Sequence, residues 1–88
     1  MFFKGETTVY QEIRTIAAKE DFVRFLRRLS MDALLHPEEW ENRTVPEYLE
    51  QVANWIEDFS ESPANDIDWD NMEFRTLARM LYMGKLYE

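Results

Sequence analysis

Apolar residues recur at intervals of three and four residues in three separate stretches of this 88-residue chain. Such spacing places them on one face of an α-helix, and it predicts helices over residues 19–35, 45–59 and 70–86. The first stretch carries its apolar stripe at Phe22, Phe25, Leu26, Leu29 and Ala33. Pro37 ends this helix, because the residue before a proline is disfavoured in the α conformation.

The second and third helices begin with recognisable start signals. Thr44 is a good N-cap and Glu47, three residues later, completes a capping box; Asp70 and Glu73 repeat the same spacing before the third helix. Because amphipathic helices must bury their apolar faces against one another, we expect core positions along both helices. The positions expected to be buried include Leu49, Ile56, Leu77 and Leu81.

The sequence therefore predicts an all-α fold, a compact bundle of three main helices in a single domain over residues 1–88. The N-terminal segment is less regular. Val9, Ile13 and Ile16 stand at helical spacing, which favours a short helix over a strand. Residues 1–8 show no clear pattern, so loose order there stays open. The chain has no cysteine, which excludes disulfides, thiolate catalysis and cysteine-based metal centres.

Charge is distributed unevenly along the chain. Residues 38–73 contain twelve acidic residues against Arg43 alone, so this stretch carries a net charge of −11. Nucleic-acid binding depends on cations facing phosphates, so it is disfavoured here. The apolar runs are only a few residues long, and the N-terminus lacks the features of a signal peptide, so we expect no membrane partner and a cytoplasmic location.

The loop before the third helix contains the one pattern that suggests a cation. Asp66, Asp68 and Asp70 occupy alternate positions, as in a calcium-binding loop. The pattern fails where it needs glycine, which is Asn71, and where it needs a bidentate glutamate, which is Leu77. We therefore expect a solvated loop in which Asp70 caps the following helix, and we assign no metal and no cofactor.

Catalytic constellations are missing from the sequence. His36 is the single histidine, without the partners that a nucleophilic triad or a histidine-based zinc site needs, and its expected place is the end of the first helix. Arg24, Arg27 and Arg28 form a small basic patch, which could bind an anion or pair with the acidic helix predicted over residues 45–59. No catalytic residue is assigned, and we expect a protein that is not an enzyme.

Several landmarks occur in a characteristic order. They are Asp21-Phe22-x-x-Phe25-Leu26-x-x-Leu29, Trp40-Glu41-Asn42, Tyr48-Leu49-Glu50, Trp55-Ile56-x-Asp58, Leu77-Ala78-x-x-Leu81 and Tyr87-Glu88. In this order they resemble a family of small bacterial domains of unknown function, over about residues 19–88. The resemblance implies a stand-alone bacterial protein, and it brings no established activity and no catalytic residues.

The leading hypothesis is a non-enzymatic interaction module that presents an acidic face to a protein with a basic surface. An inhibitor or immunity-type protein covering a basic active site fits the same physics. The partner-binding residues we single out are Glu50, Glu57, Asp58 and Glu61. Two alternatives stay open: a carboxylate-based divalent-metal or hydrolytic site, and a structural homodimer that uses the surplus aromatic residues.

Overall fold

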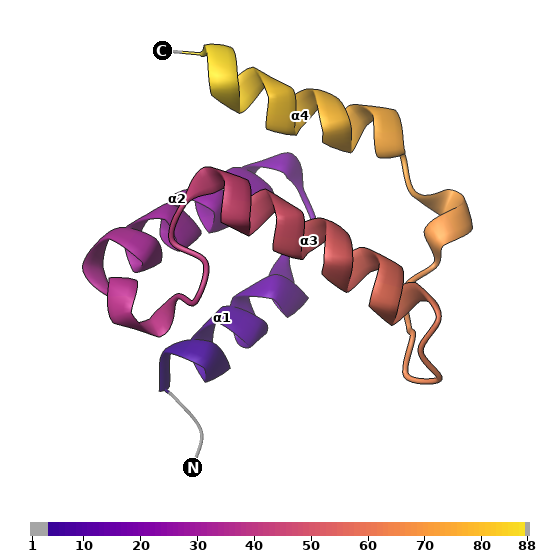
Figure 1. Ribbon diagram of the computed structural model, residues 1–88, viewed down its shortest axis with the longest axis horizontal. Coiled ribbons are helices and arrows are strands. Elements are labelled where there is room, and N and C mark those ends of the chain that lie inside the picture. Colours follow the sequence, from indigo (N-terminus) through magenta and orange to yellow (C-terminus); the bar gives the residue numbers. More distant parts are fainter. Residues whose placement is uncertain (1–3, 88) are drawn as a thin grey trace. The chain divides into compact units, whose positions relative to one another are not determined.

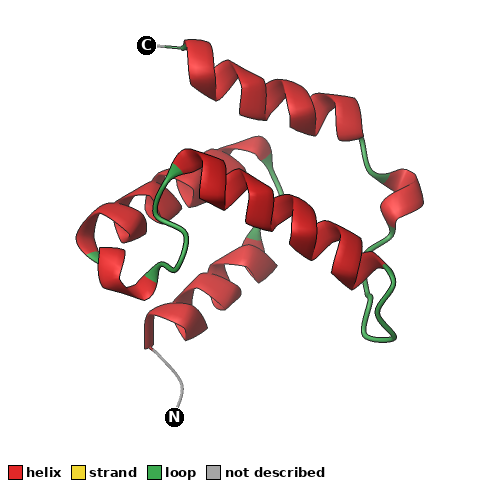
Figure 2. Cartoon of the chain, viewed as in Figure 1, coloured by secondary structure: helices red, strands yellow, loops and turns green. Residues whose placement is uncertain are grey.

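The computed structural model describes residues 4–87 and shows four α-helices (Figure 1). These are α1 (Lys4–Thr15), α2 (Lys19–Leu35), α3 (Val45–Ser60) and α4 (Phe74–Leu86), with short 3₁₀ helices η1 (Pro37–Glu39) and η2 (Trp69–Asn71) between them. Residues 4–87 contain no strand (Figure 2). The all-α prediction is confirmed, and the N-terminal segment is helical from Lys4 onward. Residues 1–3 of the segment expected to be loose lie outside the described residues.

Local signals explain where α2 and α3 begin and end. α2 covers the predicted range, and α3 extends one residue beyond it. The capping box of α3 is confirmed: the Thr44 hydroxyl accepts from the Glu47 backbone N–H at 3.3 Å, and Glu47 Oε1 accepts from the Thr44 N–H at 3.4 Å. Two backbone donors that the helix cannot satisfy are thereby paired.

The predicted start of the last helix is wrong by four residues. Asp70 lies inside η2, and α4 begins only at Phe74, with Glu73 at the N-cap position and no side-chain cap there. Met72 has extended backbone angles, φ −82° and ψ 137°, which separate the two helical segments. The Asp70–Glu73 capping box therefore does not form, because the chain at Asp70 already belongs to a different turn.

The chain divides into two compact units, Met1–Tyr48 and Leu49–Glu88. Each is described by itself below, and the single domain over residues 1–88 stays a prediction. In the first unit, α1 contacts α2, and α2 contacts η1. An ion pair between Arg28 and Glu12, 3.6 Å apart, connects α2 to α1.

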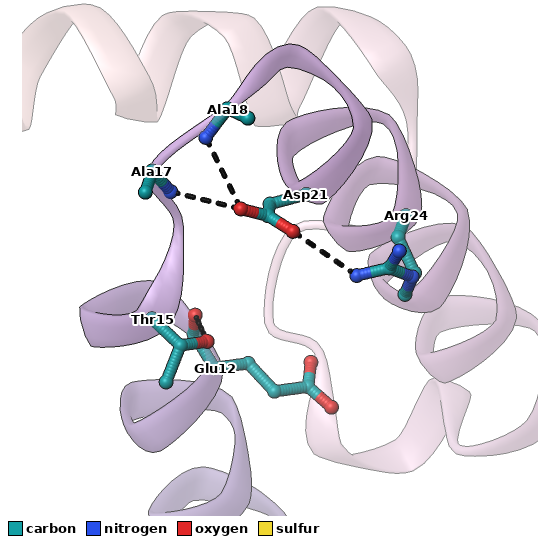
Figure 3. A network of polar contacts seen from close by, with 6 residues as sticks. All are labelled: Glu12, Thr15, Ala17, Ala18, Asp21 and Arg24. Carbon is teal, nitrogen blue, oxygen red and sulfur yellow. Dashed lines mark hydrogen bonds and ion pairs between the residues drawn. The ribbon is translucent and has the colours of Figure 1, made fainter.

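The link between α1 and α2 is organised by the carboxylate of Asp21 (Figure 3). Its Oδ2 accepts hydrogen bonds from the backbone N–H groups of Ala17 and Ala18, at 3.0 and 3.1 Å, and its Oδ1 accepts one from Arg24 at 3.2 Å. The two backbone bonds, with a smaller contribution from Arg24, hold the pKa of Asp21 below its usual value of 3.8. Arg24 and Arg28 thus pair with acids of the same chain, but these acids lie on α2 and α1 and not on the predicted acidic helix over residues 45–59.

The second unit contains most of α3, the loop after it, η2 and α4. Asn65 organises the loop: its Oδ1 accepts from the Ile67 N–H at 3.3 Å and from the Trp69 indole N–H at 2.9 Å. Trp69 stacks on Phe74 with ring centroids 6.4 Å apart, so the same indole joins the loop to the start of α4. Ile67 and Trp69 are partly buried, as the position of two apolar residues between acids suggests.

Burial is where the structure departs from the sequence-based expectation. No described side chain is fully buried, and Leu49, Ile56, Leu77 and Leu81 are exposed by 43%, 38%, 37% and 62%. The predicted burial of these four residues is therefore wrong in this structure. The difference has a physical reason: helices form through local hydrogen bonds, whereas burial requires packing between elements that are distant in the chain.

None of the helices within residues 4–87 combines the length and the apolar character needed to cross a bilayer.

Candidate functional site

Acidic side chains lie on one face of α3, in its first two turns and again near its end. At about 100° per residue, Glu47, Glu50, Glu57 and Asp58 fall within an arc of about 100° of the helix circumference. Glu61 follows in the first turn of the loop, and all five residues are exposed. We call these five residues the acidic stripe; it contains the four residues that the sequence singled out for partner binding.

The acidic stripe lacks counter-ions in the described part of the chain. Of the twelve acids in residues 38–73, only Glu38 and Glu39 form ion pairs with described residues, and their partner is His36 rather than a lysine or arginine. The four negative charges on α3 and the charge of Glu61 therefore repel one another, and no lysine or arginine of the described residues pairs with them.

The distribution of charge along α3 is favourable at one end and unfavourable at the other. Glu47 lies in the first turn, where a carboxylate complements the positive end of the helix dipole. Glu57 and Asp58 lie in the last turn, at the negative end, and that turn contains no basic residue. Among residues 4–87, no ion pair compensates these two charges, so the end of α3 departs from the charge pattern that favours a helix.

A cleft of about 490 Å³ lies in the first unit, between the second half of α2, η1 and the start of α3. Its apolar walls are formed by Leu29, Ala33, Pro37, Trp40, Val45 and Tyr48. Trp40 and Tyr48 stack with ring centroids 5.9 Å apart. The Trp40 indole N–H also donates a hydrogen bond of 2.8 Å to Asp32 Oδ2, which fixes the turn after η1 to α2.

Most polar side chains at the cleft come from the segment just before α3, and Ser30 of α2 adds a hydroxyl group. Asn42, Arg43 and Thr44 line it, and Arg43 Nε donates to the Trp40 carbonyl at 3.1 Å. Thr44 is already occupied with the α3 cap. The cleft offers a mostly apolar surface for a side chain of a ligand.

The aspartates of the loop after α3 do not form a cation site in this structure. Within residues 4–87, the one group of three or more acidic or histidine side chains with donor atoms close together is His36, Glu38 and Glu39. Asp66, Asp68 and Asp70 are exposed and do not converge, and the Asp68 carboxylate accepts a hydrogen bond from Asn71. Sequence reasoning set His36 aside because it looked for a second histidine or a cysteine.

Comparison with known families identifies one match. The model of a family of unknown function, DUF7660, matches residues 18–88, which is most of the chain. The chain belongs to the DUF7660 family. Comparisons with curated proteins and with solved structures give no significant match.

The DUF7660 match covers α2, α3 and α4 and the connections between them, and it begins just after α1. It therefore includes both the acidic stripe and the cleft. The sequence predicted a family of unknown function over about the same range, and this is confirmed. The bacterial origin and the Trp40-Glu41-Asn42 and Tyr87-Glu88 motifs stay predictions; Tyr87 is 84% exposed, and Glu88 lies outside the described residues.

Proposed function

We propose that this DUF7660 protein is a non-enzymatic interaction module whose acidic stripe binds a basic surface on another protein. The observation that carries the proposal is the position of Glu57 and Asp58 in the last turn of α3, where their charges oppose the helix dipole and no basic residue of that turn offsets them. A cationic partner would remove this conflict, because its lysines and arginines would supply the missing counter-charges.

The chemistry of the stripe favours a protein over the other classes of partner. Phosphate-rich ligands are repelled by a stretch with a net charge of −11. A basic protein surface is attracted over a distance set by the ionic strength, about 8–10 Å at 0.1–0.15 M salt, so the stripe speeds association as well as fixing orientation. A protein that covers the basic active site of an enzyme is one module of this kind.

The magnitude follows from exposed ion pairs. Each contributes about 0.2–1 kcal/mol, so four of them contribute about 1–4 kcal/mol, which changes Kd between about fivefold and several hundredfold. Neutralisation is expected to weaken binding within this range, and added salt to weaken binding of the unchanged protein in the same direction.

The test compares two quadruple variants with the same net charge. The stripe variant carries Glu50→Gln, Glu57→Gln, Asp58→Asn and Glu61→Gln. The control variant carries Glu20→Gln, Glu41→Gln, Asp70→Asn and Glu73→Gln, four exposed acids outside the stripe. Immobilised protein of each kind captures partners from a lysate of the source cells, and the Kd of each purified partner is then measured at 50, 150 and 500 mM salt.

The proposal predicts a basic partner that the unchanged protein and the control variant retain and the stripe variant loses. Equal capture by the two variants would refute a specific role of the stripe. A Kd that does not change with salt would refute the electrostatic mechanism, even if the partner is basic.

A further inference from the structure

His36, Glu38 and Glu39 bring three potential metal ligands together at the end of α2. His36 Nδ1 lies 3.8 Å from Glu38 Oε1 and 4.0 Å from Glu39 Oε2, and all three donor atoms lie within 4.8 Å of one another. The three side chains are exposed, so an ion reaches them without any movement of the backbone.

We propose that His36, Glu38 and Glu39 bind a divalent transition-metal ion of the zinc type. Ligands at about 2.0–2.2 Å from a tetrahedral zinc lie about 3.3–3.6 Å from one another, whereas the donor atoms here are separated by 3.8 Å, 4.0 Å and at most 4.8 Å. Small side-chain rotations of the two glutamates therefore complete the site. One imidazole and two carboxylates fill three positions, and water fills the fourth.

The backbone of the site is already in place before any ion binds. Pro37 restricts the chain between the histidine and the glutamates, and the turn is closed by hydrogen bonds from Glu39 N–H to the His36 carbonyl, 3.0 Å, and from Trp40 N–H to the Pro37 carbonyl, 3.1 Å. The Trp40 indole then fixes the turn to Asp32 at 2.8 Å. Metal binding has to order only three side chains, which keeps its entropic cost low.

The ligand set also determines which ion is selected. Calcium and magnesium prefer six or more oxygen ligands and gain little from an imidazole, whereas zinc, nickel and cobalt bind imidazole nitrogen well. The site shares no residue with the acidic stripe, so a failure of one proposal leaves the other intact. Because Trp40 is the next residue after the ligands, its fluorescence provides a local signal for the ion.

The experiment uses the full chain without a polyhistidine tag, titrated with ZnCl₂ in a calorimeter and with NiCl₂ while tryptophan emission is recorded. We expect one ion per chain, quenching of the emission by Ni²⁺, and no competition from an excess of Mg²⁺. His36→Ala is expected to lower the affinity for Zn²⁺ at least about 10–100-fold, which is the loss seen when a residue that only supports a metal ligand is removed. Glu39→Gln is expected to lower the affinity by a smaller factor.

Glu41→Gln is the matched control, because Glu41 is an exposed acid two residues beyond the site and outside the ligand set. It is expected to bind Zn²⁺ like the unchanged protein. Because His36 is exposed, His36→Ala is expected to fold like the unchanged protein, and circular dichroism checks this. Binding of unchanged affinity in His36→Ala would overturn the proposal, as would the absence of saturable binding in the unchanged protein.

Discussion

Removing the two charges at the end of α3 should make the protein more stable. Glu57 and Asp58 lie in the last turn of the helix, where carbonyl groups without a partner inside the helix carry the negative end of the dipole. Each carboxylate placed at the wrong end of a helix costs about 0.3–1 kcal/mol. The double variant Glu57→Gln/Asp58→Asn is therefore expected to gain about 0.6–2 kcal/mol in the free energy of unfolding.

The assay is urea unfolding followed by circular dichroism at 222 nm, supported by thermal unfolding. For a domain of this size, Tm rises by about 4–8 °C for each kcal/mol. The gain is expected to shrink in 1 M salt, because the charges are exposed and salt screens them.

Glu47→Gln provides a control of opposite sign on the same helix. Glu47 lies at the positive end, so loss of its charge is expected to cost about 0.3–1 kcal/mol, while the amide oxygen still accepts from the Thr44 N–H. If both variants shift the stability in the same direction, the electrostatic reasoning about α3 is wrong. If Glu57→Gln/Asp58→Asn destabilises the protein, those carboxylates make stabilising contacts, and the proposal loses the observation that carries it.

Three further predictions concern stability. Trp40→Phe removes the indole N–H that donates a hydrogen bond to Asp32, and it is expected to lower the free energy of unfolding by about 1–2 kcal/mol in urea. The control Trp55→Phe changes a residue that is 52% exposed and is expected to cost less than about 0.5 kcal/mol. Equal losses of stability in the two variants would contradict a stabilising role of the Trp40–Asp32 hydrogen bond. Because the pKa of Asp21 is lowered from 3.8 in the folded protein, its carboxylate stabilises the fold above about pH 4, and this contribution is lost as the pH falls through the lowered pKa. The difference in unfolding free energy between the unchanged protein and Asp21→Asn should therefore disappear in acid. A difference that does not change with pH would refute this reasoning. Gly84→Ala should stabilise α4 by about 0.5–1 kcal/mol in thermal unfolding, because an added Cβ meets no atom within 4 Å, and a loss of stability would reveal a contact at that position.

The helices could be predicted from the sequence because their signals are local. Apolar spacing and Pro37 gave the bounds of α2, and the Thr44–Glu47 capping box gave the start of α3. The same box spacing misled at Asp70, because the Trp69 indole bonds to Asn65 and the chain there forms a 3₁₀ turn instead. The capping-box spacing alone cannot predict the contact between Trp69 and Asn65.

The candidate sites also differ in how far the sequence alone predicts them. The acidic stripe follows from helical periodicity, so Glu50 and Glu57 could be placed on one face in advance. The cleft could not, because it depends on Trp40 reaching both Asp32 and Tyr48 from a turn whose direction no sequence pattern encodes. The group around His36 was within reach: a histidine, a proline and two glutamates in succession form a short turn with three ligands on it.

The most direct test of the proposed interaction maps the partner's contact surface on the protein. Backbone amide spectra of isotope-labelled protein are recorded with and without the basic partner captured in the pull-down. We expect the largest shifts at the residues of the acidic stripe on α3, declining as salt is added. Shifts concentrated at the cleft around Trp40, with the stripe unchanged, would contradict the assignment of the acidic stripe as the binding surface.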